Sequence, residues 1–373
     1  MTPAIILCLV AALTAVSWLY VLERADKQVS QQKVMAEQGV ASAQAIEWKL
    51  VTSWPKNFPG LGMAPELFAE WVNRASNGRL IVKVYGGGEL VPPLGVFDAV
   101  SLGSVQMGHT GSYYWKGKTF ASVFFASMPF GMTAQEMNAW LHYGGGLELW
   151  RELYAPFNII PFAGGNTGVQ MAGWFNKEIK SIEDIKGLKM RIPGVGGEIF
   201  SRVGGTVVSL PGSELYTALQ TGVIDATEWV GPYNDRAFGL HEVAKYYYYP
   251  GWHEPGSNLE FLINKDAYQA LPTDLQEIVT LAARAANQAM LDEYTARNNN
   301  ALLAIQQDPN IEIRKLPDDV LKAFKTEGEK YLQEVIASDE VAKKVYQSWQ
   351  AFADDVKNYH HLSEQAFINA RDL

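Results

Sequence analysis

Three segments bring together the residue types of known catalytic motifs, and each lacks a part that its chemistry needs. GSYYWKGKT, from Gly111, has five residues between its glycines, whereas a phosphate-binding loop has four. HEVAK, at His241, has no second histidine, so two imidazoles cannot share a zinc ion on one helical face. GVGGEIF, at Gly194, lacks the third glycine of a dinucleotide fingerprint. The segments therefore do not indicate nucleotide- or zinc-dependent catalysis.

Adjacent ionisable residues near the C-terminus are no better placed for chemistry. Asp354 and Asp355 lie in a segment with the pattern of an exposed helix, which favours a solvated face over an acid and base pair. His360 and His361 are neighbours, and adjacent side chains on a helix do not face each other. Without a complete catalytic motif the chain is better interpreted as a binding protein, although catalytic groups need not be contiguous.

The composition is that of a globular protein. The 373 residues are 48% hydrophobic and 19% charged, and a chain of this length is expected to form two lobes. The net charge of −9 argues against a nucleic-acid partner, because such binding depends on clustered Lys and Arg. The single cysteine, Cys8, excludes an intrachain disulfide and a cysteine-rich metal site.

Residues 1–45 are predicted to be an export signal or a membrane anchor followed by a tether. The stretch from Pro3 to Leu22 is nearly all apolar and matches the length of roughly 20 residues that a helix needs to span a bilayer. A polar stretch follows it. No Lys or Arg precedes the apolar run, and the small-x-small sequence that begins at Ala43 lies far beyond it, so a retained anchor is at least as well supported as a cleaved signal.

Strands and helices alternate from Ile46 onward, which indicates parallel units of an open α/β sheet. The first series is IEWKLVTSW (strand), APELFAEWVNRASNG (helix), LIVKVY (strand), GVFDAVSLG (helix) and VQMGHTGS (strand). A second series follows the Pro- and Gly-punctuated NIIPFAGG: VQMAGWF, KMRI and TVVSL as strands, with GGEIFSRVG and GSELYTALQTG as helices.

The rest of the chain is predicted to be largely helical. LEFLINK has the pattern of a returning strand, long helices follow from Pro272 to Ala304 and from Pro317 onward, and the short strand IEIRKL separates them. Two crossings between lobes would form a hinge. The predicted first lobe comprises residues 46–166 and 256–295, the second lobe with a hinge helix comprises 167–255 and 296–338, and 339–373 form a C-terminal helical extension.

The stretch from Ile185 to Trp229 resembles the DctP-type solute-binding proteins of TRAP (tripartite ATP-independent periplasmic) transporters. It reads IKGLKMRIPGVGGEIFSRVGGTVVSLPGSELYTALQTGVIDATEW. It contains a GLKMRxP strand, a glycine pair and an ExYxALQxGxxD helix at the spacing of that family. The resemblance implies an α/β, two-lobed periplasmic binding protein fold with a hinge cleft and long C-terminal helices. It also implies a receptor that is not an enzyme and that works with TRAP membrane subunits in the periplasm, exported or tethered to the inner membrane.

Arg191 is the first predicted ligand-binding residue. A guanidinium can bind a carboxylate through two parallel hydrogen bonds, and the resemblance gives Arg191 that role. The alternative is that Arg191 forms an inter-strand salt bridge.

The resemblance also implies a cation-assisted site like that of the subgroup of the family that binds 2-oxo acids. Gln170, Glu228, the backbone carbonyl of Trp229, and Glu254 are the predicted cation ligands, with Gln170 and Trp229 also at the organic ligand. Two glutamates, one arginine and one ligand carboxylate leave a net charge of about −2, which is costly in a closed pocket without a cation. Calcium would neutralise this charge, and the subgroup indicates sodium, so both stay open. Glu254 could instead face water.

Tyr113 and Tyr114 are candidate ligand-binding residues, because they follow a predicted strand at the edge where open α/β sheets bind ligands. Packing in the core is an equally good interpretation.

The predicted ligand is a small 2-oxo monocarboxylate such as pyruvate, with a hydroxy acid or a sugar acid as the alternative. Two other classes stay open. One is a carboxylate-modifying enzyme that uses Glu228 and Glu254 as acid and base, and the other is a membrane-tethered sensor. The helical tail from Asp339 to Leu373 resembles a subgroup whose C-terminal helix exchanges between partners, which implies a homodimer.

Overall fold

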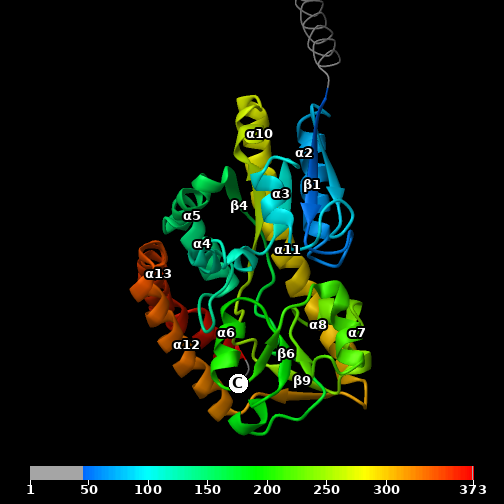
Figure 1. Ribbon diagram of the computed structural model, residues 1–373, viewed down its shortest axis with the longest axis vertical. Coiled ribbons are helices and arrows are strands. Elements are labelled where there is room, and N and C mark those ends of the chain that lie inside the picture. Colours follow the sequence, from blue (N-terminus) through cyan, green and yellow to red (C-terminus); the bar gives the residue numbers. More distant parts are fainter. Residues whose placement is uncertain (1–44, 372) are drawn as a thin grey trace, which may run out of the picture.

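The computed structural model describes residues 45–371 and 373, which form two β-sheets surrounded by helices (Figure 1). The predicted signal or anchor lies outside the described residues, apart from Ala45. Within the described part of the chain, no helix is both long enough and apolar enough to cross a bilayer.

The first sheet has the strand order β2-β1-β3-β10-β4. Strand β1 pairs in parallel with β2 and with the central strand β3, while β10 is antiparallel to β3 and β4. Strand β10 follows β5 to β9 in the chain, so the first sheet includes a strand that comes after most strands of the second sheet in the sequence. Its strands are β1 (Ile46–Thr52), β2 (Leu80–Tyr85), β3 (Met107–Thr110), β4 (Ile159–Asn166) and β10 (Asn258–Asn264).

The second sheet has the strand order β11-β9-β5-β8-β6-β7 and also mixes directions. Strand β6 runs parallel to β7 and β8, and β5 is antiparallel to β8 and β9. Its strands are β5 (Gly173–Phe175), β6 (Lys189–Arg191), β7 (Thr206–Val208), β8 (Ala226–Thr227), β9 (Tyr246–Tyr249) and β11 (Glu312–Lys315). Below, the first lobe is the part built on the first sheet, and the second lobe is the part built on the second.

Helices cover both sheets, and the last of them wrap along one side of the molecule. Around the first sheet lie α2 (Met63–Ala75), α3 (Val96–Ser101), α4 (Ala134–Tyr143), α5 (Gly146–Tyr154) and α10 (Lys265–Gln269). Around the second lie α6 (Gly194–Arg202), α7 (Leu215–Gln220), α8 (Pro232–Ala237) and α9 (Leu240–Val243). The long helices are α11 (Thr273–Gln306), α12 (Asp318–Ser338) and α13 (Glu340–Leu362), followed by the short α14 (Glu364–Arg371). The 3-10 turns are η1 (Ser112–Trp115), η2 (Phe120–Phe125), η3 (Ala155–Phe157), η4 (Ile182–Ile185) and η5 (Gly212–Glu214).

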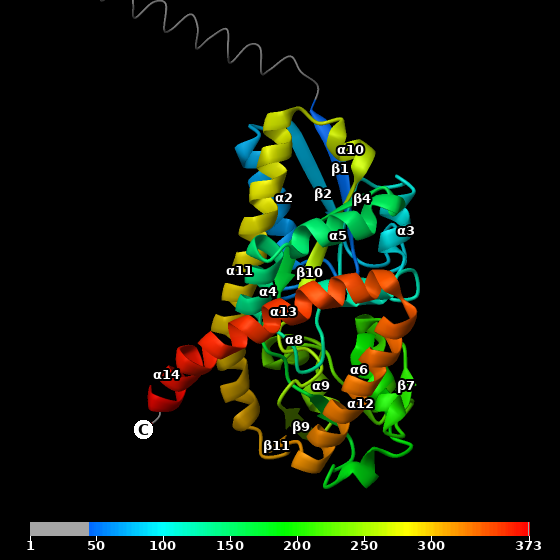
Figure 2. The same ribbon diagram turned by 90° about the vertical axis from the view of Figure 1, so that its left-hand side faces the viewer.

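Helix α11 ties the two lobes together. It runs along both of them and contacts α2 and β4 of the first lobe and α8 of the second (Figures 1 and 2). Near its middle, the Tyr294 hydroxyl donates a 2.6 Å hydrogen bond to Asn234 Oδ1, and the Asn234 amide donates to the carbonyl of Pro59 in the first lobe. The second lobe is therefore pinned to the first beside α8, the helix that follows the predicted site residues.

Helix α13 packs back on the body, whereas α14 projects from it (Figure 2). Ala342, Val345 and Trp349 of α13 are buried and belong to the same hydrophobic cluster as η2 and α4. At the other end, Leu362 and Phe367 are 84% and 65% exposed. Leu362 and Phe367 therefore leave apolar surface exposed near the end of the predicted C-terminal extension.

The sequence predicted most elements of the two series within a few residues, and one segment differs. NIIPFAGG was interpreted as the punctuation between two series, but Ile159–Asn166 is strand β4, paired along its length with β10. The parallel units predicted for the first series are confirmed by the pairing of β1 with β2 and β3, while β10 and β5, for which no direction was predicted, are antiparallel to their neighbours. A buried strand tolerates Pro161 here because β4 lies at the edge of its sheet.

Candidate ligand-binding and cation site

Arg191 ends strand β6 and is buried, with only 3% of its surface exposed. Its Nε donates to the carbonyl of Leu210 at 3.1 Å, and its Nη1 donates to Glu228 Oε1 at 2.6 Å. The guanidinium also lies over the indole of Trp229, 5.2 Å from the ring centroid. The Arg191 side chain is thus held in one orientation by the Leu210 carbonyl, the Glu228 carboxylate and the Trp229 ring.

Strand pairing brings Glu228 to Arg191. In the parallel register of β6 and β8, Arg191 lies opposite Thr227, and the next amide, that of Glu228, donates to the Arg191 carbonyl. The alternative interpretation of Arg191 as an inter-strand salt bridge is therefore also present in the structure. Glu228 is 1% exposed, so the pair is fully removed from water.

Glu254 comes from the loop between β9 and β10 and meets Gln170, which precedes β5. The Gln170 amide donates to Glu254 Oε2 at 2.7 Å, and their backbones are joined by a 3.2 Å hydrogen bond. Gly251 permits this approach, because a Cβ there would lie 2.1 Å from the Gln170 carbonyl oxygen. Glu254 is 5% exposed, so it does not face water. Burial, followed in size by repulsion from the charge of Glu228, raises the pKa of Glu254 to about 7.

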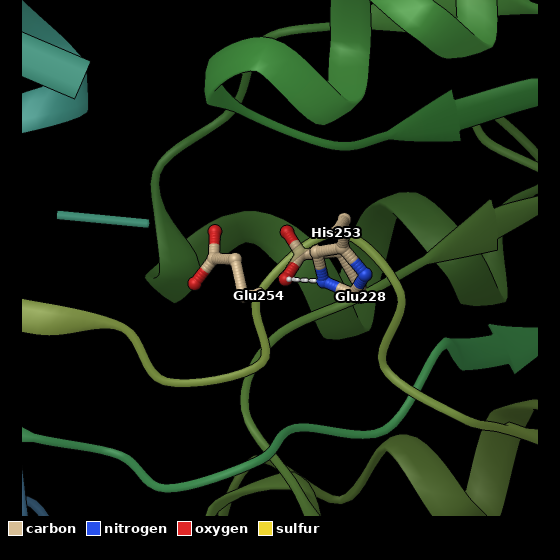
Figure 3. A group of neighbouring side chains, drawn as sticks. All are labelled: Glu228, His253 and Glu254. Carbon is tan, nitrogen blue, oxygen red and sulfur yellow. Dashed lines mark hydrogen bonds and ion pairs between the residues drawn. The ribbon is translucent and has the colours of Figure 1, made fainter. Parts of the chain in front are cut away.

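The two glutamates form part of a group that fits a cation. One ligand atom each from Glu228, His253 and Glu254 lies within 4.8 Å of the others (Figure 3). Gln170 Oε1 is buried and has no hydrogen-bond partner among the residues that the structure describes. Carboxylate and amide oxygens are the donors preferred by Ca²⁺, and a cation here would also relieve the repulsion between the glutamates. Gln170, Glu228 and Glu254 therefore fit the predicted role, while the Trp229 ring is engaged with Arg191 and leaves only its carbonyl for it.

Tyr113 and Tyr114 reach this cluster from the first lobe. Both lie on η1, directly after β3, and are half-buried. Burial, followed by the charge of Glu254, raises the pKa of Tyr113 well above its ordinary value. Burial also raises the pKa of Tyr114, and the charge of Arg191 opposes that rise. These interactions place both phenols within electrostatic reach of the second-lobe charges, as a wall supplied by the other lobe.

The structure brings all the predicted site residues into one neighbourhood, and it adds His253. Its Nε2 lies 3.2 Å from Glu228 Oε2, and it is 2% exposed (Figure 3). The sequence offered one signal for it, its position next to Glu254, and a single histidine in a loop is too common to be singled out on that basis.

A two-lobed α/β fold with charged groups of one lobe facing tyrosines of the other is the arrangement expected of a solute-binding protein. Comparison with known families agrees, because residues 50–339 match the model of the DctP family, described as bacterial extracellular solute-binding protein, family 7. The chain belongs to this family, whose members are the TRAP solute receptors that its motifs resemble. It is therefore a receptor and not an enzyme.

A curated relative is the monocarboxylate 2-oxoacid-binding periplasmic protein of Nostoc sp., which is 44% identical over 87% of this chain and 88% of its own length. Three crystal structures of TRAP solute-binding proteins share the two-lobed fold, which confirms the predicted fold class. The Colwellia psychrerythraea protein, with bound calcium and pyruvate, is 43% identical, covers 88% of this chain and 100% of its own, and superposes with a TM-score of 0.86.

The two other structures contain a different cation or a different organic ligand. The Pseudoalteromonas atlantica protein, with sodium and pyruvate, is 44% identical over 87% of this chain and 99% of its own, with a TM-score of 0.85. The Bordetella bronchiseptica protein, a mixed-occupancy dimer with calcium and picolinate, is 36% identical over 88% and 97%, with a TM-score of 0.86.

Proposed function

We propose that this chain is the extracytoplasmic receptor of a TRAP transporter for a small 2-oxo monocarboxylate of the pyruvate type, bound through Arg191 and a bridging cation. The observation that carries the proposal is the buried cluster of Arg191, Glu228, Glu254 and Gln170. The cluster combines a donor for a carboxylate with oxygen ligands for a cation, and two relatives above 40% identity hold pyruvate together with a cation.

Arg191 would bind the ligand carboxylate through its Nη atoms, beside the Tyr114 hydroxyl that also hydrogen-bonds the guanidinium. Its Nε donates to the Leu210 carbonyl and one Nη1 hydrogen to Glu228, so the other Nη hydrogens are the ones that can be donated to a ligand. When bound, the cation supplies a positive centre for the keto and carboxylate oxygens. Gln170, Glu228, Glu254 and the Trp229 carbonyl would hold it, while Tyr113 and Tyr114 would cover the ligand from the first lobe.

The charge balance bears on which cation binds. Two ionised glutamates, Arg191 and a ligand carboxylate sum to about −2, so Ca²⁺ would neutralise the site and Na⁺ would leave about −1. The Colwellia and Pseudoalteromonas proteins hold calcium and sodium respectively. We propose sodium or calcium, with the ligand and the cation bound together.

The receptor is proposed to act in the periplasm, exported or tethered to the inner membrane, and to deliver its ligand to the TRAP membrane subunits. We also propose a homodimer, because Leu362 and Phe367 leave apolar surface exposed where α14 projects. Light scattering should then give twice the monomer mass of 41.3 kDa, and a Leu362→Asp, Phe367→Asp variant should be monomeric. A monomeric wild-type chain would contradict this assembly.

Calorimetry tests the ligand and the cation together. The purified chain is titrated with pyruvate, lactate and galacturonate in calcium, in sodium, and after chelation in a buffer without either ion. We expect pyruvate to bind most tightly and to lose at least about tenfold in affinity without the cation, since the two glutamates and Arg191 leave the empty site with a net charge of about −1, which then repels the ligand carboxylate. Tighter binding of galacturonate than of pyruvate would overturn the proposed ligand, and cation-independent binding would overturn the proposed site.

A further inference from the structure

Glu228 is held at both of its carboxylate oxygens, by two different side chains. Arg191 Nη1 donates to Oε1 at 2.6 Å, and His253 Nε2 lies 3.2 Å from Oε2 (Figure 3). The two donors differ in function, because Arg191 would also bind the ligand carboxylate. His253 is the donor that stays with Glu228 alone.

The hydrogen-bond pattern of His253 assigns its proton. Nδ1 is buried and has no hydrogen-bond partner within the described part of the chain, so Glu228 is the one acceptor that the ring meets there. An imidazole that faces a carboxylate carries a proton on the nitrogen nearest to it, here Nε2. Nε2, which donates to Glu228, has no lone pair left for a cation, and Nδ1, which keeps one, lies on the side of the ring away from Glu254 (Figure 3).

The position of the ring is fixed from behind by the backbone. A Cβ at Gly196, in the first turn of α6, would lie 3.0 Å from His253 Cβ, so the helix packs directly against this residue. The Trp252 ring lies edge-to-face with the imidazole, with centroids 5.6 Å apart, and itself stacks on Phe324 at 4.2 Å. The imidazole therefore packs between fixed neighbours with Nε2 toward Glu228.

We propose that His253 is a positioning residue of the cation site, which donates Nε2–H to Glu228 Oε2 and fixes that carboxylate for the cation without binding the cation itself. Ligating carboxylates depend on such hydrogen bonds for their orientation, and Na⁺ and Ca²⁺ prefer oxygen to nitrogen. The inference rests on the proposed function and adds a residue to it.

Two polar substitutions separate positioning from ligation. In His253→Gln the side-chain amide nitrogen reaches the place of Nε2 and can still donate to Glu228. In His253→Asn the amide is one bond shorter and falls at the place of Nδ1. Titration with Ca²⁺ alone should leave His253→Gln within about threefold of wild type, and should weaken His253→Asn by about 10- to 100-fold, the usual effect of losing such a partner.

Two results would contradict the positioning role. Both require that the variants have the circular dichroism spectrum of the wild type, which shows that they are folded. If His253→Gln binds Ca²⁺ as weakly as His253→Asn, the imidazole itself is required and the positioning role is wrong. If His253→Asn binds like wild type, His253 has no role at the cation site. The Ca²⁺ titration contains no organic ligand, so its outcome stands apart from the pyruvate titration. Failure of wild type to bind pyruvate would overturn the proposed function and leave this test intact.

Discussion

Arg191 and Glu228 form an ion pair with Nη1 and Oε1 2.6 Å apart, and both side chains are almost completely buried. A pair of this kind is costly to desolvate and gives little net stability, so its burial indicates a function. Arg191 faces both Glu228 of its own lobe and the tyrosines of the other lobe, so it lies between the two lobes at the proposed ligand site.

Replacing Arg191 by lysine should abolish tight binding while keeping the charge. A lysine has no planar fork, and its ammonium cannot serve Leu210, Glu228 and a ligand carboxylate from one position. We expect pyruvate affinity to fall at least about 100-fold, or ~3 kcal/mol, measured by calorimetry. Arg202→Lys, at an exposed arginine on α6 paired with Glu334, is the matched control and should bind as wild type. Equal affinities for the two variants would remove Arg191 from the site.

Gln170→Ala should weaken cation binding more than it affects folding. The substitution removes Oε1, which has no partner among the described residues, and the donor to Glu254 Oε2. Loss of one neutral oxygen ligand should cost about 10-fold in Ca²⁺ affinity or more, by analogy with other changes around metal sites. The exposed Gln220→Ala, on α7, provides the control. If Ca²⁺ binds Gln170→Ala unchanged, Gln170 is not a cation ligand.

Lys116 and Glu198 form an ion pair across the two lobes, between the end of η1 and α6. Both side chains are partly exposed, so the pair contributes at most about 1 kcal/mol. Lys116→Glu should therefore weaken pyruvate binding by up to about fivefold at low salt, and the exchanged pair Lys116→Glu, Glu198→Lys should restore it. Lys118→Glu is the control, because Lys118 pairs with Asp98 inside the first lobe. A double variant as weak as the single one would show that the pair does not support closure.

Glu260 should make stability fall as pH rises. This buried carboxyl accepts hydrogen bonds from Trp115 and Tyr154, and burial raises its pKa to about 8. Between the ordinary value near 4.5 and about 8, the native state keeps a proton that the unfolded chain has lost. The free energy of unfolding therefore decreases with rising pH over that window, by up to about 1.4 kcal/mol per pH unit from this group.

Glu260→Gln should remove this dependence, because an amide resembles the protonated acid. Denaturant unfolding at pH 5.5 and pH 8.5 should show the variant gaining stability over wild type at the higher pH. Glu47→Gln, at an exposed position on β1, should show no such gain. If the difference between wild type and Glu260→Gln is the same at both pH values, Glu260 does not retain its proton in the native state.

The sequence predicted the fold and most of the site where local patterns or a family motif carried the information. Arg191 and Glu228 lie in or directly after the motif-bearing stretch, and the parallel pairing of β6 with β8 makes them neighbours. Strand β4 was missed because Pro161 and its glycines have the composition of a turn, and only pairing with the distant β10 makes that segment a strand.

His253 was missed for a related reason. Its role depends on a contact with Glu228, which is far away in the sequence, and on the helix that packs behind it at Gly196. No local spacing encodes such a contact. The same holds for Glu260, whose neighbours Trp115 and Tyr154 come from separate parts of the first lobe.

A crystal structure grown with pyruvate and calcium tests the central claim most directly, because it shows which atoms hold the ligand. We predict pyruvate with its carboxylate within about 3 Å of the Arg191 Nη atoms and a calcium ion in contact with Gln170, Glu228 and Glu254. Pyruvate bound away from Arg191, or a calcium ion that none of these three residues contacts, would contradict the account.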